Sequence, residues 1–452
     1  MEVISAITSL KSRPSFAIKD GFVVTPQITP ISLAFLISYI TAFAYTQIPA
    51  DTATVKGVLP NGLTYYIRHN DYIPNRAAFH IAQKVGSIQE TQGQRGLAHF
   101  LEHMAFNGTK HYPDKALINY LETIGVKFGA NLNAYTSVDE TVYMITDVPT
   151  ERVSTVDSCL LILRDWSDGI LLEAEAIDKE RGVIEEEWRT RNNPILRQIE
   201  DNAPVIYAGD KYADCMPIGN MDVVRNCPYD TLRSYYNTWY RPDLQGIVVV
   251  GDIDVKRTEE KIKELFADAK VPEGAPERVY YPVSEYKEPC IVISADAETP
   301  FTLLTYSQKV DDIPDSLKST EEGLKQAFIR ELASSMLSDR LSDVMKEAEP
   351  PFVGANAYYG DFLLSGKQKC FEIGAQVSNA GAEVAFTRLM EEVERMRRYG
   401  FTNAELDRVK KETLAAYEKS YNERNTVRNI RYAQEYIRHY LSDEPIPGIA
   451  WE

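Results

Sequence analysis

The amino-acid sequence predicts an α+β fold made of two homologous domains. At 452 residues the chain is longer than one hydrophobic core ordinarily supports. Strand-like and helix-like patterns follow one another in the same coarse order in both halves, which favours a duplicated domain. A stretch rich in proline and charge, residues 271–289, separates the halves. We therefore expect an export signal or unstructured leader at 1–50, a first domain at 51–272 and a second domain at 273–452.

The first domain is predicted to begin with a β-hairpin. In VLPNGLTYYIRHN, apolar residues flank Asn61-Gly62, a strong signal for a tight turn between two strands. The segments RAAFHIAQKVGS and KFGANLNAYTSVDETVYMITDV alternate like further strands. The remaining predicted elements are helices at 96–106, 114–124, 153–167 and 174–190, a less regular helical stretch towards 240, a buried strand in 246–254 and an amphipathic helix in VKRTEEKIKELFADA.

The same order of patterns restarts at Cys290. A strand in FTLLTYS precedes a long helix that runs through Ser338, and strands are predicted around Tyr358 and Phe371. Helices follow at 382–399 and 403–440. The last residues, DEPIPGIAWE, place prolines and an apolar tip directly after a helix, so we expect a connection to a longer polypeptide.

Composition excludes several classes of protein. The apolar content of 44% and charged content of 25% are those of a soluble globular protein. A formal net charge of −17 argues against nucleic-acid binding, which needs a basic surface. The five cysteines lack CxxC spacing, which excludes a zinc knuckle or a redox pair. Cys215 and Cys227 are close enough in sequence to form a disulfide in an oxidising compartment.

The predicted leader contains an uncharged segment at residues 21–50. Its apolar run, ISLAFLISYITAFAY, is too short for a comfortable membrane span and contains Ala42-Phe43-Ala44, a pattern that signal peptidase cleaves after. We expect an export signal, a mature chain that begins near Tyr45, and no stable membrane span. The alternatives are a buried N-terminal helix or an unusual membrane anchor, because the basic residues lie far from the apolar run.

A metal-binding pattern stands in the predicted helix at 96–106, in the segment GLAHFLEHMAFNGT. Residues four apart share one face of a helix, so His99 and His103 can reach the same metal ion. Catalytic zinc takes three protein ligands and keeps an open position for water, whose proton a nearby carboxylate accepts. Glu102 projects to the same side and completes an H-x-x-E-H motif. The alternative is a pair of core or surface histidines, so the hypothesis requires a third ligand.

Candidates for the third ligand occur in KERGVIEEEWRTR, residues 179–191. Glu180 and Glu187 are seven apart, two turns along one helical face. The alternative is a solvated acidic face paired with neighbouring arginines. Spacing alone does not decide which of the acids binds metal, since Glu185 and Glu186 stand beside Glu187.

Four segments together resemble the pitrilysin/insulinase family of metallopeptidases: HFLEHMAFNGT, NAYTS, ERGVIEEE and YRPDLQGIVVVGDID. The four segments occur in that family's order and close to its spacing. The resemblance runs from Val58 to the end of the chain and is strongest through Asp254. Within the family, the sequence most resembles the exported bacterial zinc proteases of the PqqL type. It implies two homologous domains, each a mostly antiparallel sheet covered by helices on one face, as in mitochondrial processing peptidases.

The resemblance also assigns roles to residues. It implies one Zn²⁺ per chain, with Glu187 as the third ligand and Glu180 as an outer acid that orients a zinc-binding histidine. It implies that Asn133-Ala134-Tyr135 forms an edge strand that docks the substrate backbone by strand addition.

The activity implied is that of a zinc-dependent endopeptidase, exported to the bacterial periplasm, which hydrolyses peptides or unfolded polypeptides through a metal-activated water. Family members enclose substrate between two halves, and the second half supplies an arginine and a tyrosine that have no match here. We therefore expect the catalytic half of an enzyme, which needs the C-terminal half of the same polypeptide or a partner subunit. The alternatives are a non-catalytic structural or peptide-holding subunit, or a peptide-binding module without chemistry.

Overall fold

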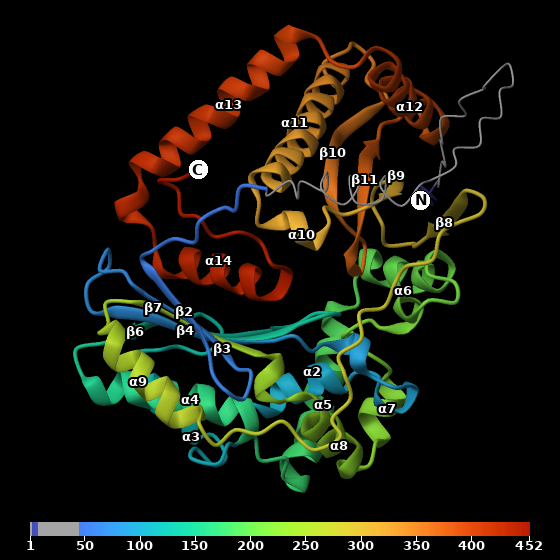
Figure 1. The fold of residues 1–452 in the computed structure, drawn as a ribbon. Coiled ribbons are helices and arrows are strands. Elements are labelled where there is room, and N and C mark those ends of the chain that lie inside the picture. Colours follow the sequence, from blue (N-terminus) through green and yellow to red (C-terminus); the bar gives the residue numbers. More distant parts are fainter. Residues whose placement is uncertain (1, 8–44) are drawn as a thin grey trace, which may run out of the picture.

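The computed structural model describes residues 2–7 and 45–452, which form two α+β units joined by an extended segment (Figure 1). Both units combine a mostly antiparallel sheet with packed helices, as the sequence predicts. The expected signal sequence and its cleavage site fall almost wholly in residues 8–44, outside the described range. None of the helices described is both long and apolar enough to cross a membrane.

In the described part of the chain, the first sheet has six strands in the order β2-β3-β7-β4-β6-β5. Neighbouring strands are antiparallel except β3 and β7, which are parallel. The predicted hairpin at Asn61-Gly62 is confirmed, and β7 is buried along its whole length. The strands are β2 (Thr54–Val58), β3 (Thr64–His69), β4 (Arg76–Gln83), β5 (Leu132–Thr136), β6 (Thr141–Pro149) and β7 (Gln245–Gly251).

Helices pack mainly against one face of this sheet, below it in Figure 1. The predicted helices of the first unit are confirmed, and their ends agree with the prediction to within three residues. The less regular helical stretch towards residue 240 consists of three helices, α6, α7 and α8. Asn193 and Asn220 cap the first two of these, because each side chain accepts a backbone N–H of the following turn. The helices are α2 (Leu97–Met104), α3 (Ala116–Thr123), α4 (Val153–Asp168), α5 (Ala174–Arg191), α6 (Pro194–Ile206), α7 (Met221–Asn226), α8 (Tyr229–Trp239) and α9 (Val255–Phe266).

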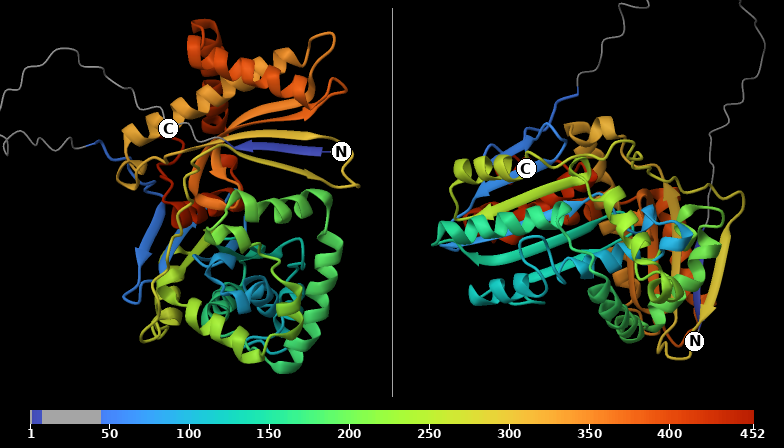
Figure 2. Two further views of the ribbon diagram at one scale, coloured as in Figure 1. Left: turned by 90° about the vertical axis from the view of Figure 1, so that its right-hand side faces the viewer. Right: turned by 90° about the horizontal axis from the view of Figure 1, so that it is seen from below.

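The second sheet has the order β10-β11-β9-β1-β8 among the described residues, with β1 parallel to β9 and antiparallel to β8. Helices α11 and α12 cover it, as the upper part of Figure 1 and the left view of Figure 2 show. Its strands are β1 (Glu2–Ile7), β8 (Cys290–Ala295), β9 (Leu303–Val310), β10 (Phe352–Phe362) and β11 (Ser365–Val377). The helices of this half are α10 (Asp315–Lys318), α11 (Glu321–Val344), α12 (Ala382–Tyr399), α13 (Asn403–Asn422) and α14 (Asn429–Ser442).

The prediction of one helix over 403–440 is wrong. Helix α13 ends at Asn422, a short 3₁₀ turn follows at Arg424–Thr426, and α14 then runs in a new direction (Figure 1). The physical reason is that α14 buries an apolar face, including Tyr436 and Tyr440, on the opposite side of the first sheet. Gly246 on β7 makes room for it, because a Cβ there would lie 2.7 Å from the Tyr440 ring.

The division at residue 272 stays a prediction. Helix α14, which we assigned to the second domain, packs on the sheet of the first and ties the two units together. The possible disulfide between Cys215 and Cys227 does not form, since both are free, buried thiols. They belong to different apolar clusters, one around Tyr207 and one beneath the first sheet.

Candidate metal centre

Helix α2 carries the H-x-x-E-H motif, and its N-terminus is held firmly in place. Gly96 precedes it with a φ of 98°, a left-handed conformation that favours glycine. The side-chain oxygens of the buried Glu90 accept hydrogen bonds from the backbone N–H groups of Gly96 at 2.9 Å and Ala98 at 2.7 Å. The other face of the helix is buried in the core of the first domain. This anchoring fixes where the two histidines emerge.

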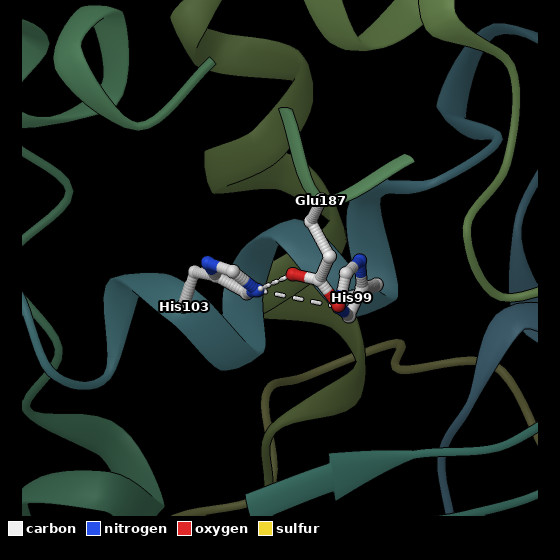
Figure 3. Close-up of side chains that lie close together, drawn as sticks. All are labelled: His99, His103 and Glu187. Atoms are coloured by element: carbon white, nitrogen blue, oxygen red, sulfur yellow. Dashed lines mark hydrogen bonds and ion pairs between the residues drawn. The ribbon is translucent and has the colours of Figure 1, made fainter. Parts of the chain in front are cut away.

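His99 and His103 on α2 point toward Glu187 on α5 (Figure 3). The His103 Nε2 atom lies 3.3 Å from His99 Nε2 and 3.0 Å from Glu187 Oε2. His99 Nε2 lies 3.5 Å from Glu187 Oε1. The structure thus brings together two residues four apart with a third that is distant in the sequence.

The choice among the neighbouring acids is made by the rotation of α5. Glu185 points away and pairs with Arg189 and Arg225, at 2.7 and 3.0 Å. Glu186 is exposed beside Arg189. Of the three, Glu187 is the one whose carboxylate faces both histidines.

This donor set fits zinc. Two imidazole nitrogens and one carboxylate oxygen are ligands that zinc accepts, and three protein ligands leave a position open for water. Within the described residues, Glu187 Oε1 is buried without a hydrogen-bond partner, although Arg191 Nη1 forms an ion pair with it at 2.8 Å. A largely buried carboxylate that faces two imidazole nitrogens is suited to a bound cation.

The electrostatics of the cluster also favour positive charge. Hydrogen bonds with His103 and His99 hold the pKa of Glu187 well below its usual range. Burial lowers the pKa of His103, but hydrogen bonds to Glu180 and Glu187 outweigh this effect and raise it to about 9. The acids therefore stabilise a cation at the place where the imidazole nitrogens converge.

Glu180 lies behind the histidine pair. Its Oε1 accepts a hydrogen bond from His103 Nδ1 at 2.8 Å, so this ring nitrogen carries the proton. The Nε2 lone pair is thereby left for a metal ion, an arrangement common to histidine ligands.

Glu102 lies on the same helix and turns toward β5. Thr136 Oγ1 on β5 donates a hydrogen bond to Glu102 Oε2 at 2.5 Å. The buried hydroxyls of Tyr143 and Tyr240 bond to each other at 2.7 Å, and burial together with the nearby negative charge of Glu102 raises the pKa of both. Sequence analysis missed Thr136, although it belongs to the NAYTS segment.

Strand β5 forms one edge of the first sheet. It pairs with β6 on one side, where Asn133 lies opposite Met144 and Tyr135 opposite Val142. The described residues place no strand on its other side. Asn133 and Tyr135 are exposed, and the Tyr135 hydroxyl donates to Glu140 at 2.9 Å. At this edge the Ala134 N–H donates to Asn133 Oδ1 at 2.9 Å instead of to a neighbouring strand.

Comparison with known proteins places these features in a family. Residues 69–202 match "Insulinase (Peptidase family M16)", and residues 226–413 match "Peptidase M16 inactive domain". The first range contains every metal-site residue named above.

Two curated relatives are called zinc proteases. The chain is 31% identical over 400 residues to the "Zinc protease PQQL-like" of Arabidopsis thaliana, a match that covers 88% of this chain and 38% of the relative. It is 31% identical over 372 residues to the "Probable zinc protease PqqL" of Escherichia coli K12, covering 81% and 39% respectively. The chain therefore spans about two fifths of the length of these relatives.

Solved structures share the fold. The first half of the periplasmic protease PqqL from Escherichia coli superposes with a TM-score of 0.78 at 26% identity, over 90% of this chain and 85% of that one. Pitrilysin matches with a TM-score of 0.67 at 19% identity, over 89% of this chain and 43% of that one. Sequence, fold and site geometry agree: the chain belongs to the insulinase family of peptidases, M16, and is of the PqqL type.

Proposed function

We propose that this chain is the catalytic half of a zinc-dependent endopeptidase that hydrolyses peptides or unfolded polypeptides. The observation that carries the proposal is the convergence of His99, His103 and Glu187 beside Glu102. A purely structural subunit has no need of this set. Several relatives carry the name zinc protease, which supports the choice of Zn²⁺ as the metal, and the single cluster of three ligands among the described residues is suited to one ion per chain.

The roles of the residues follow from their positions. His99, His103 and Glu187 would hold the ion, which when bound makes water a stronger nucleophile and polarises the peptide carbonyl. Glu102 takes a proton from the attacking water and delivers it to the leaving amine. Thr136 holds the Glu102 carboxylate toward β5 through its hydrogen bond to Oε2.

Peptide backbone binds along the free edge of β5 in this proposal. An added strand would pair along the segment Asn133, Ala134 and Tyr135 at the edge of the sheet, as peptides do when they extend a sheet, and would replace the hydrogen bond that the Ala134 N–H now donates to Asn133 Oδ1. Because Thr136 follows directly on the same strand, the added peptide runs past Glu102. A scissile bond would then lie within reach of the base.

A further half completes the chamber. The chain spans about two fifths of the length of its curated relatives. The arginine and tyrosine that the family resemblance implies have no match in its sequence. We assign them to the C-terminal half of the same polypeptide or to a partner subunit. We also propose export to the bacterial periplasm, since the similar Escherichia coli protein is described as periplasmic.

Substitution of Glu102 tests the proposal. Glu102→Gln in the reconstituted enzyme is expected to keep about one zinc per chain, measured by elemental analysis, and to abolish hydrolysis of a quenched fluorescent peptide. Glu186→Gln is the matched control, because this acid is exposed and pairs with Arg189 within the described residues, and the change is expected to leave both readouts unchanged.

Other outcomes separate the alternatives. Undiminished hydrolysis by Glu102→Gln shows that Glu102 is not the base. Zinc retained by the His99→Ala, His103→Ala double variant overturns the metal site. Peptide binding without hydrolysis in the wild-type enzyme, with the second half present, supports the peptide-holding alternative instead.

A further inference from the structure

A chain of hydrogen bonds continues behind His103, on the side away from the other ligands. Glu180 uses one oxygen for His103 Nδ1, and its second oxygen, Oε2, accepts a hydrogen bond from Asn107 Nδ2 at 2.7 Å. Glu180 is only 8% exposed, so water has little access to either oxygen. Both ends of this carboxylate are therefore held by protein groups.

Three different partners fix the Asn107 side chain. Its Nδ2 also donates to the backbone carbonyl of His103 at 3.1 Å, and its Oδ1 accepts from Lys115 Nζ at 2.6 Å. The Lys115 ammonium can only donate, whereas a carboxylate and a carbonyl can only accept. The amide consequently has one orientation that satisfies all of its contacts, with Nδ2 toward Glu180.

This orientation matters for the metal-binding face. A carboxylate tethered at both oxygens cannot rotate, so it holds the His103 ring in one plane with the proton on Nδ1. The Nε2 lone pair then stays directed at His99 and Glu187. Without Asn107, Oε2 of Glu180 would be buried and unpaired, which destabilises this conformation of the carboxylate.

We propose that Asn107 is a positioning residue of the metal site, acting through Glu180 on the ring and tautomer of His103. This inference rests on the proposed zinc site and adds to it a residue that touches neither metal nor substrate. Asn107 occupies the turn after α2, so the segment that carries the ligand His103 also supplies the amide that holds Glu180.

Zinc affinity of the purified chain tests the inference through competition with a chromophoric chelator. Asn107→Leu keeps the shape of the side chain but removes the donor, and is expected to weaken zinc binding by about 3- to 10-fold; Glu180→Gln is expected to weaken it by about 10- to 100-fold. The visible absorption spectrum of the Co²⁺-substituted protein should change in both. Asn226→Leu is the matched control, because its exposed amide donates only to Asp222 O on its own helix, at 3.0 Å.

A charge-preserving exchange makes the test specific. In Glu180→Gln the introduced amide group meets the Asn107 amide donor to donor. Adding Asn107→Asp supplies an acceptor, restores the hydrogen bond in reverse and returns the pair to its original net charge. Because Asn107→Asp also removes the donor to the His103 carbonyl, the double variant is expected to recover part of the zinc affinity lost in Glu180→Gln and to shift the Co²⁺ spectrum back toward that of the wild type, which a merely structural role for Asn107 would not produce.

The outcomes distinguish this inference from the proposed function. If the wild-type chain binds no zinc, the proposed function fails. The positioning role of Asn107 is wrong, while the metal site stands, if the wild-type chain binds zinc and the zinc affinity of Asn107→Leu lies within twofold of the wild-type value. It is also wrong if the double variant binds zinc no more tightly than Glu180→Gln does.

Discussion

The N-terminus of the motif helix rests on a backbone contact that a single methyl group would break. A Cβ at Gly219 would lie 2.2 Å from both Cα and N of Gly96, the residue that precedes α2. The neighbouring Asn220 N–H donates to Arg95 O at 3.2 Å, so the two loops are also tied by hydrogen bonding. We predict that Gly219→Ala destabilises the first domain and displaces α2.

The magnitude follows from two terms. Gly219 has a φ of +71°, where a residue with a Cβ costs about 1–2 kcal/mol. Overpacking adds about 1–3 kcal/mol, because the atoms that the methyl meets are backbone and cannot rotate away. A total near 3 kcal/mol corresponds to a fall in Tm of roughly 6–12 °C for a domain of this size.

Calorimetry of the metal-free protein measures the fall in Tm directly. A zinc titration then reports whether the metal ligands have moved, because displaced ligands lower the zinc affinity. Gly93→Ala is the control, since a Cβ there meets nothing within 4 Å and it lies close to Gly96 in the sequence. We expect its effect to stay within about 0.5 kcal/mol. Equal Tm values for the two variants would refute the argument from the Gly96–Gly219 contact.

Three further predictions concern pH, packing and metal. Burial raises the pKa of Glu90 to about 8 despite its backbone hydrogen bonds, so the stability that the protonated side chain contributes is full below about pH 4.5 and is lost as the pH rises to 8. Glu90→Gln should therefore flatten the fall in Tm between pH 5 and 8. Identical slopes of Tm against pH in the variant and the wild type would contradict this. Arg340 is 7% exposed and donates to the Glu405 carboxylate at 2.5 and 3.0 Å, so Arg340→Met should lower the free energy of unfolding by about 3 kcal/mol, measured by chemical denaturation. Arg408→Met is the control, because its pair with Asp339 is exposed and its loss should cost less than about 0.5 kcal/mol. Zinc at about 100 times its Kd should stabilise the chain by about 2.7 kcal/mol, an increment that a chelator removes; a Tm insensitive to the chelator would count against the metal site.

Much of the fold was accessible from local pattern. The Asn61-Gly62 turn, the fully apolar β7 and the helix over 382–399 were all predictable because their signals lie within a few consecutive residues. The break at 423–428 was not, because it depends on where α14 finds an apolar surface. That surface is on the other domain's sheet.

The sequence by itself determined the chemistry of the candidate site. His99, Glu102 and His103 share a helix, so their spacing alone places them on neighbouring positions of one face. Residue spacing left the third acid open and the family resemblance implied Glu187; the tertiary structure supplies the physical reason, because the rotation of α5 against α2 sets Glu187 inward and Glu185 outward. The groups that orient the site were likewise hidden: Asn107 meets Glu180, and Thr136 meets Glu102, across tens of residues. Such contacts arise from packing between elements, and no local periodicity encodes them.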